Sequence, residues 1–343
     1  MKKILVASSA LVAVAFAGHA QASEKISLSV SGYMNQWIGG ASNGKEASGG
    51  AKNAFVSDTE VHFKGSTTLD NGIEVGAAIE FEAEGEANNN TDEQYLYING
   101  GFGQVKLGQE DGAAADMTIT APGVGMVGVN GSDASYWANM PATPDNKWDS
   151  GDDGKLTYYT PVIGGFRAGV SYTDQDGSET NDNISSGDSV VAAGVEYKAD
   201  FDGVSVAVAA TGEHKEEGEW YNIGTSVGFG NVTVGGSYGK KDYEFGKGKG
   251  NYAGFDDDWG ADIGVVYAMD AASVSLSYMY SEVQGSTANV DPDEADIVDL
   301  GLSYTLGAGV TWTSSVFWYN NDSKTASRDT DAVGAVTGLK LSF

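Results

Sequence analysis

Cysteine is absent from the 343 residues, and proline occurs only five times. Without cysteine the chain can form no disulfide, so its fold must be held together by other means, and a closed hydrogen-bonded barrel is one of them. Three of the prolines lie within residues 109–153, and Pro161 follows just beyond. That interval therefore differs in composition from the rest of the chain.

Basic residues are also scarce, with 19 Lys and Arg against 48 Asp and Glu and a formal net charge of −29. Arginine occurs only at Arg167 and Arg328. Binding to nucleic acid needs clustered basic side chains, so this charge excludes nucleic acid as a partner. Cations and cationic solutes are the partners that it favours.

Long apolar runs are lacking, and the longest one lies at the N-terminus. Residues 1–22 begin with Lys2 and Lys3, continue with an apolar run from Ile4 to Ala17, and end in small residues at Ala22. This is the pattern of a secretory signal peptide with cleavage after Ala22. A membrane-spanning helix needs about 18 apolar residues, and the run is shorter than that. We expect a signal peptide at 1–22 and a single exported domain at 23–343.

Glycine and aromatic residues are abundant, with 49 Gly, 17 Tyr, 12 Phe and 7 Trp. The sequence alternates apolar and polar residues with period two, which indicates β-strands. In residues 57–69, for example, Val61 and Phe63 share one face, while Glu60, His62 and Lys64 share the other. Aromatic residues, among them Trp37 and Phe317 to Tyr319, cluster near the strand ends, which is typical of the girdles of a membrane β-barrel.

The alternation predicts sixteen strands, joined in turn by short turns and longer connections. An even strand number with short turns at one end and long loops at the other predicts an all-β transmembrane antiparallel barrel, whereas a soluble sandwich does not explain this rhythm. The strands are expected at residues 25–38, 57–69, 73–84, 93–99, 102–109, 155–161, 166–173, 190–199, 204–213, 219–228, 232–240, 257–268, 272–283, 296–305, 310–320 and 331–343.

Two motifs suggest catalysis or nucleotide binding, but neither has the required context. Residues 123–128 match GxGxxG without a preceding strand or a following helix. Residues 224–228 match GxSxG inside an alternating strand rather than at a strand-to-helix turn. His62 and His214 are the histidines left after signal cleavage, and neither has a recognisable triad context. We therefore expect no catalytic residue and no enzyme activity.

Acidic clusters fall on or beside the long loops. Oxygen ligands of this kind suit Ca²⁺ or Mg²⁺. The alternatives are a solvated acidic loop and ion-bridged contact with lipopolysaccharide, and the sequence leaves all three open. The candidate ligands are Asp152, Asp153, Asp256, Asp257 and Asp258.

The segments Phe102–Gly108 and Tyr158–Phe166 and the terminal Phe343 resemble the general porins of Gram-negative outer membranes, particularly the α-proteobacterial type. The resemblance covers the whole mature chain. It implies a homotrimer of sixteen-stranded barrels in outer-membrane lipid, with Phe343 as a C-terminal assembly signal. It also implies that residues 109–153, the third outer loop, fold inward and narrow a pore for passive diffusion.

The same resemblance implies that acids on the loop face bases on the barrel wall. Each of these residues can instead be a solvated wall or packing residue. Because acids predominate, we expect mild cation selectivity. A solute-specific channel and a secreted acidic β-protein with an ion-binding or adhesive role remain alternatives. The loop acids are Glu110, Asp111, Asp116 and Asp133, and the wall bases are Lys64, Lys106, Arg167 and Lys198.

Overall fold

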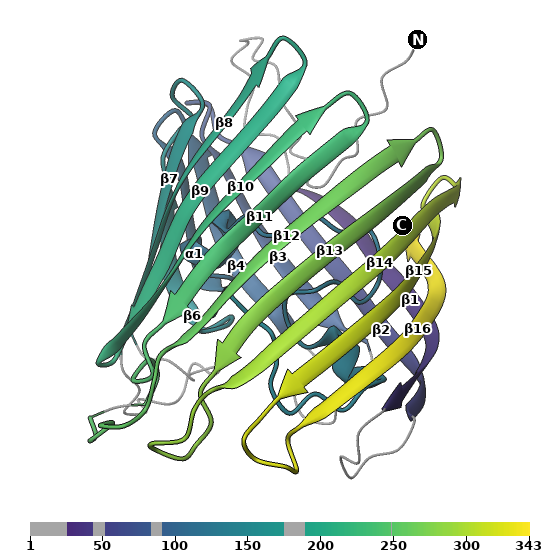
Figure 1. The fold of residues 1–343 in the computed structure, drawn as a ribbon. Coiled ribbons are helices and arrows are strands. Elements are labelled where there is room, and N and C mark those ends of the chain that lie inside the picture. Colours follow the sequence, from purple (N-terminus) through teal and green to yellow (C-terminus); the bar gives the residue numbers. More distant parts are fainter. Residues whose placement is uncertain (1–25, 44–51, 84–90, 175–188, 248) are drawn as a thin grey trace.

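The computed structural model describes residues 26–43, 52–83, 91–174, 189–247 and 249–343, so the signal peptide expected at 1–22 lies outside the described residues. The chain forms a closed barrel of sixteen strands (Figure 1). Each strand pairs antiparallel with its neighbours in sequence, and β1 pairs with β16 to close the ring. Closure gives every strand two neighbours.

The strand number and order confirm the expected fold class, and the bounds agree to within a few residues at most positions. The strands are β1 (Ser27–Asn43), β2 (Lys52–Thr68), β3 (Glu74–Glu82), β4 (Thr91–Gly100), β5 (Gly103–Gln109), β6 (Gly154–Tyr159), β7 (Phe166–Thr173), β8 (Val190–Phe201), β9 (Val204–Lys215), β10 (Gly218–Phe229), β11 (Val232–Lys241), β12 (Asp258–Met269), β13 (Ala272–Val283), β14 (Asp293–Gly307), β15 (Val310–Asp322) and β16 (Thr330–Ser342).

The largest boundary difference is the connection between β1 and β2. The alternation stops near Ile38, but the two strands continue to pair as far as Ala41 opposite Lys52. Backbone hydrogen bonds form the ladder, so Gly39 and Gly40 extend the strand although they contribute nothing to the side-chain pattern.

Side chains follow the expected alternation between an apolar outer face and a polar lumen. On β3, Ile79 and Phe81 are exposed on the outside, whereas Glu80 points inward and is buried. An apolar outer face suits a hydrocarbon environment. Within the described residues, no helix is both long and apolar enough to cross a membrane.

Several aromatic residues that the pattern assigned to interfacial girdles lie inside the barrel instead. Trp318 faces outward, but its neighbours Phe317 and Tyr319 are 1% and 0% exposed. Trp37 on β1 is buried as well. The girdle interpretation is wrong for these three residues, because they pack against a segment that enters the lumen.

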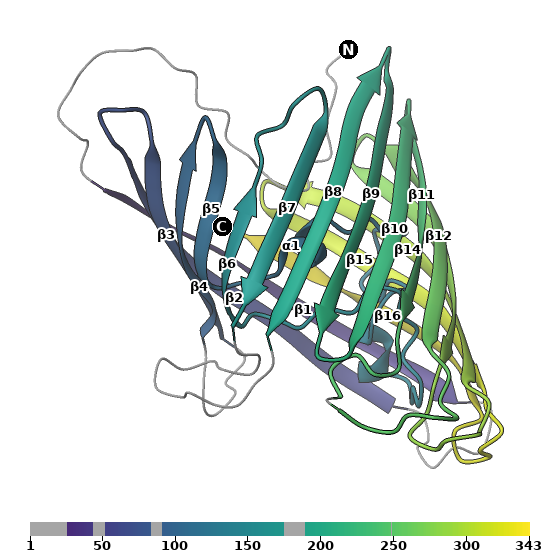
Figure 2. The ribbon, with the colours of Figure 1, turned by 90° about the vertical axis from the view of Figure 1, so that its left-hand side faces the viewer.

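That segment is the long interval between β5 and β6. It contains a short helix, α1 (Ala113–Met117), which lies inside the barrel (Figure 2) and contacts β6 to β9. It also contains a 3-10 helix, η1 (Asp133–Tyr136), which contacts β2. Neither helix was expected from the sequence, although the alanines at the start of α1 favour helix. Trp137 and Val127 join Ile297, Phe317 and Val336 of the wall in one buried apolar cluster.

The wall residues that contact the loop backbone are small or polar. The Val124 amide donates to Ser275 Oγ at 3.0 Å, and the Ala121 amide donates to Asp262 Oδ1 at 3.0 Å. At Gly224 on β10, an added Cβ would overlap the carbonyl oxygen of Ile119. The loop backbone can therefore lie directly on the wall backbone.

Replacing Gly224 by alanine should destabilise the protein, because the new methyl group must displace the loop backbone. Overpacking of this kind costs about 1–3 kcal/mol. The measurement is urea unfolding in lipid vesicles, followed by tryptophan fluorescence. Gly285→Ala is the control, since an added Cβ meets no atom within 4 Å there. Equal stability of the two variants would contradict the packing described here.

Candidate functional site

The loop contacts given above lie on β1, β2, β6 to β10 and β12 to β16. The charged side chains on β2 to β4 are mostly acidic. Lys64 is the one lysine or arginine on β2 to β4 apart from Lys52, whose side chain lies outside the described part. Carboxylates are far more numerous on the same strands: Asp58, Glu60, Glu74, Glu80, Glu82, Asp92 and Glu93.

Two of the expected loop acids lie beside one wall lysine. Glu110 is fully buried, and its Oε2 pairs with Lys106 Nζ. Lys155 Nζ donates to the backbone oxygen of Glu110 and, at 2.8 Å, to that of Gly151. Glu110 is thus part of the base of the loop, where it holds the two ends of the loop together.

Asp116 is placed differently, since it is partly exposed on α1. Its Oδ2 accepts a hydrogen bond from Tyr159 Oη and lies 3.5 Å from Lys106 Nζ. Lys106 therefore bridges a buried acid and a lumen-facing acid. The structure brings Lys106, Glu110 and Asp116 together.

The other two loop acids are separate from this group. Asp111 is half-buried next to Glu110, whereas Asp133 is exposed at the start of η1, near β2. The four acids do not form one row. They occupy the base, the first helix and the second helix of the loop.

The remaining wall bases pair with acids of the wall rather than with the loop. Lys64 Nζ lies 2.8 Å from Glu80 Oε1. Arg167 Nε lies 2.8 Å from Glu196 Oε1, and Lys198 Nζ lies 2.7 Å from Glu196 Oε2. Sequence parity showed which way these side chains face, but not that Glu80 and Glu196 are their partners. Pairing at such distances cancels most of the positive charge of the wall.

Burial changes the titration of two further acids of the loop. It raises the pKa of Asp145 to about 6, and it raises the pKa of Asp152 to about 6 with help from the nearby charges of Asp111 and Asp92. A carboxyl group whose pKa is higher in the folded protein than in the unfolded chain stabilises the fold below the unfolded pKa. This stabilisation is lost as the pH rises through the folded pKa of about 6. The loop therefore carries less negative charge in mildly acidic solution.

Two of the acids in the clusters beside the long loops form ion pairs with lysines. Asp257 Oδ2 lies 2.7 Å from Lys240 Nζ, and Asp258 Oδ2 lies 2.7 Å from Lys241 Nζ. Asp153 is buried. In the described ranges, groups of three converging ligand-type side chains occur on β2 to β4 rather than at these clusters.

A closed barrel with an apolar outer face, a charged lumen and a loop packed inside it defines a membrane pore. The model of the Gram-negative porin family matches residues 7–324, and the chain belongs to this family. The protein is accordingly a multi-pass β-barrel of the outer membrane and a channel for passive diffusion.

Solved structures share the fold at low sequence identity. The anion-selective porin from Comamonas acidovorans is 17% identical with a TM-score of 0.65, and the match covers 93% of this chain and 100% of that chain. The trimer form of OmpT from Vibrio cholerae is 11% identical with a TM-score of 0.65, at the same coverage. A mutant of Rh. blastica porin is 17% identical with a TM-score of 0.58, covering 92% of this chain and 100% of that one. No curated protein matches the chain.

Replacing Lys106 by methionine should strongly destabilise the protein, because Glu110 would remain buried without its charge partner. Removing one member of a buried ion pair costs about 3–5 kcal/mol. Urea unfolding measures the loss.

Lys198→Met is the matched control for this substitution. Its side chain is 60% exposed and Arg167 still pairs with Glu196, so the cost should stay below about 1 kcal/mol. The double variant Lys106→Met/Glu110→Gln should recover part of the loss. If Lys106→Met were as stable as Lys198→Met, the pair would have no structural role.

Proposed function

We propose that this porin forms a water-filled pore for small hydrophilic solutes and ions, with a mild preference for cations. The observation that carries the selectivity is the excess of carboxylates on β2 to β4, where Lys64 is the single described base and is itself paired with Glu80. The other three wall bases, Lys106, Arg167 and Lys198, also have acidic partners.

The proposed constriction lies between the loop 109–153 and the wall formed by β2 to β5. Charges on the two sides of a narrow pore act on a passing ion, because the Debye length at physiological ionic strength is about 8 Å. On the loop side, the partly exposed Asp116 and the exposed Asp133 add to the negative potential. Rings of acidic side chains favour cations by this mechanism.

The proposed assembly is a homotrimer in contact with outer-membrane lipid and lipopolysaccharide. The trimer form of the OmpT neighbour supports the oligomeric state. Phe343 is proposed as the assembly signal. Its amide donates to the Gly32 oxygen at 3.0 Å, the Gly32 amide donates back at 2.9 Å, and its side chain is 64% exposed. Asp152, Asp153 and Asp256 to Asp258 stay candidates for Ca²⁺ or Mg²⁺ that bridges to lipopolysaccharide.

A solute-specific channel is the second candidate within the same family. Tyr95 and Tyr97 face the lumen on β4, so the wall offers two aromatic surfaces for a sugar or another solute. Uptake into proteoliposomes distinguishes the two functions. Rates that fall smoothly with solute size support general diffusion, and saturable uptake of one solute would replace it. The secreted acidic β-protein does not agree with membership of the porin family.

Reversal potentials across a planar bilayer in a KCl gradient should show a cation preference for the wild type. The double variant Asp58→Asn/Asp116→Asn should move the potential toward zero, because it removes a negative charge from each side of the constriction. Glu219→Gln is the control, since Glu219 is exposed on the outer face of β10. A wild-type preference for anions would refute the proposed selectivity.

A further inference from the structure

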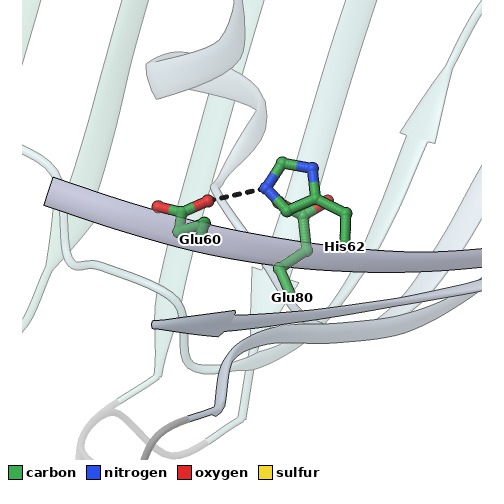
Figure 3. Close-up of side chains that lie close together, drawn as sticks. All are labelled: Glu60, His62 and Glu80. Atoms are coloured by element: carbon green, nitrogen blue, oxygen red, sulfur yellow. Dashed lines mark hydrogen bonds and ion pairs between the residues drawn. The ribbon is translucent and has the colours of Figure 1, made fainter. Parts of the chain in front are cut away.

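The lumen face of β2 and β3 brings a histidine between two carboxylates. Glu60 and His62 are two residues apart on β2, so both point into the barrel. Glu80 is the register partner of His62 on β3. Figure 3 shows the three side chains close together on the wall.

The ligand-type atoms of the three side chains converge. His62 Nε2 lies 2.8 Å from Glu60 Oε2 and 3.3 Å from Glu80 Oε2, and all three atoms lie within 4.8 Å of one another. Ligand distances of 2.0–2.2 Å in a tetrahedral zinc site place neighbouring ligand atoms about 3.4 Å apart. A small outward movement of the two carboxylates is therefore enough to admit an ion.

Both carboxylates are held in place by a second partner. Tyr33 Oη donates to Glu60 Oε1 at 2.5 Å, and Lys64 Nζ lies 2.8 Å from Glu80 Oε1. In each carboxylate one oxygen is bound by the wall and the other one faces His62. Outer partners that orient the ligands in this way are typical of metal sites. The two carboxylates are therefore fixed in orientation, unlike the side chains of a solvated acidic cluster.

We propose that Glu60, His62 and Glu80 bind a divalent transition-metal ion of the Zn²⁺ class on the pore wall. An imidazole nitrogen with two carboxylate oxygens suits zinc and its neighbours, whereas Ca²⁺ and Mg²⁺ prefer oxygen ligands alone. Glu82 and Asp92 converge on Glu60 within 4.8 Å and can hold a water molecule as the fourth ligand.

The proposed site is open to the lumen, since the side chains of His62, Glu60 and Glu80 are 19%, 15% and 11% exposed. An ion reaching the pore can therefore bind without unfolding any element. A bound divalent ion offsets the charge of the two carboxylates and reduces the attraction of the wall for cations. This effect on permeation rests on the proposed pore function, but the binding itself does not.

Metal binding is tested directly on the full-length protein in detergent with Co²⁺ as the probe. Visible absorption of tetrahedral Co²⁺ should appear with the wild type and be displaced by Zn²⁺ but not by Mg²⁺. His62→Gln should weaken the binding by more than about tenfold, because it removes the nitrogen ligand. His214→Gln should bind like the wild type, since His214 is exposed near the far end of β9.

Tyr33→Phe tests the orienting role of the tyrosine and leaves all three ligands in place. It should weaken Co²⁺ binding by about tenfold. Loss of Co²⁺ absorption in all variants together with a lowered unfolding midpoint would indicate misfolding, so the unfolding of each variant is measured in parallel. A folded wild type without Co²⁺ absorption, or a His62→Gln variant that binds like the wild type, would overturn the proposal.

Conductance gives a second, separate readout. Zn²⁺ should lower the single-channel conductance of the wild type and of His214→Gln, but not that of His62→Gln. If the protein binds Co²⁺ and forms no channel, the proposed pore fails while the metal site stands. If the channel conducts and Zn²⁺ changes neither its conductance nor the Co²⁺ spectrum, the metal site fails while the pore stands.

Discussion

The hydrogen bonds between β1 and β16 close the barrel, and the rest of the structure depends on this closure. In hydrocarbon a backbone polar group without a partner is costly, so the chain must pair every strand with two neighbours. Gly32 of β1 and Phe343, which follows β16, exchange backbone hydrogen bonds where the first and last strands meet. Once the ring is closed, alternate residues have to point outward or inward, and this separates an apolar outer face from a charged lumen.

The loop between β5 and β6 breaks the symmetry of that ring. Its apolar side chains, such as Trp137 and Val127, bury themselves against Phe317 and Ile297 on the inner wall. Gly224 lets the loop backbone approach the wall closely. The loop contacts described above lie on β1, β2, β6 to β10 and β12 to β16, and none of them lies on β3 or β4. These contacts therefore leave the carboxylates of β3 and β4 uncovered.

Charge pairing along the lumen wall is local. Lys64 is matched by Glu80, Arg167 and Lys198 share Glu196, and Lys106 joins Glu110 to Asp116. Bases that are neutralised by close neighbours contribute little to a field across the lumen. The acids in excess then set the sign of the potential. His62 lies beside two of these carboxylates, Glu60 and Glu80, and the three side chains are of the types that bind metal ions. Net charge alone does not suggest such a group.

The sequence by itself determined the sixteen strands, their order and the facing of their side chains, because alternation with period two is a local property. It also located the loop at residues 109–153 through its prolines and its lack of alternation. The tertiary structure decided which residues meet. The pairing of Lys64 with Glu80 and the approach of His62 to Glu80 depend on the register of β2 against β3. The inward packing of Phe317 and Tyr319 depends on a loop that precedes them by more than 160 residues. Contacts between residues so distant in sequence leave no trace in a local pattern.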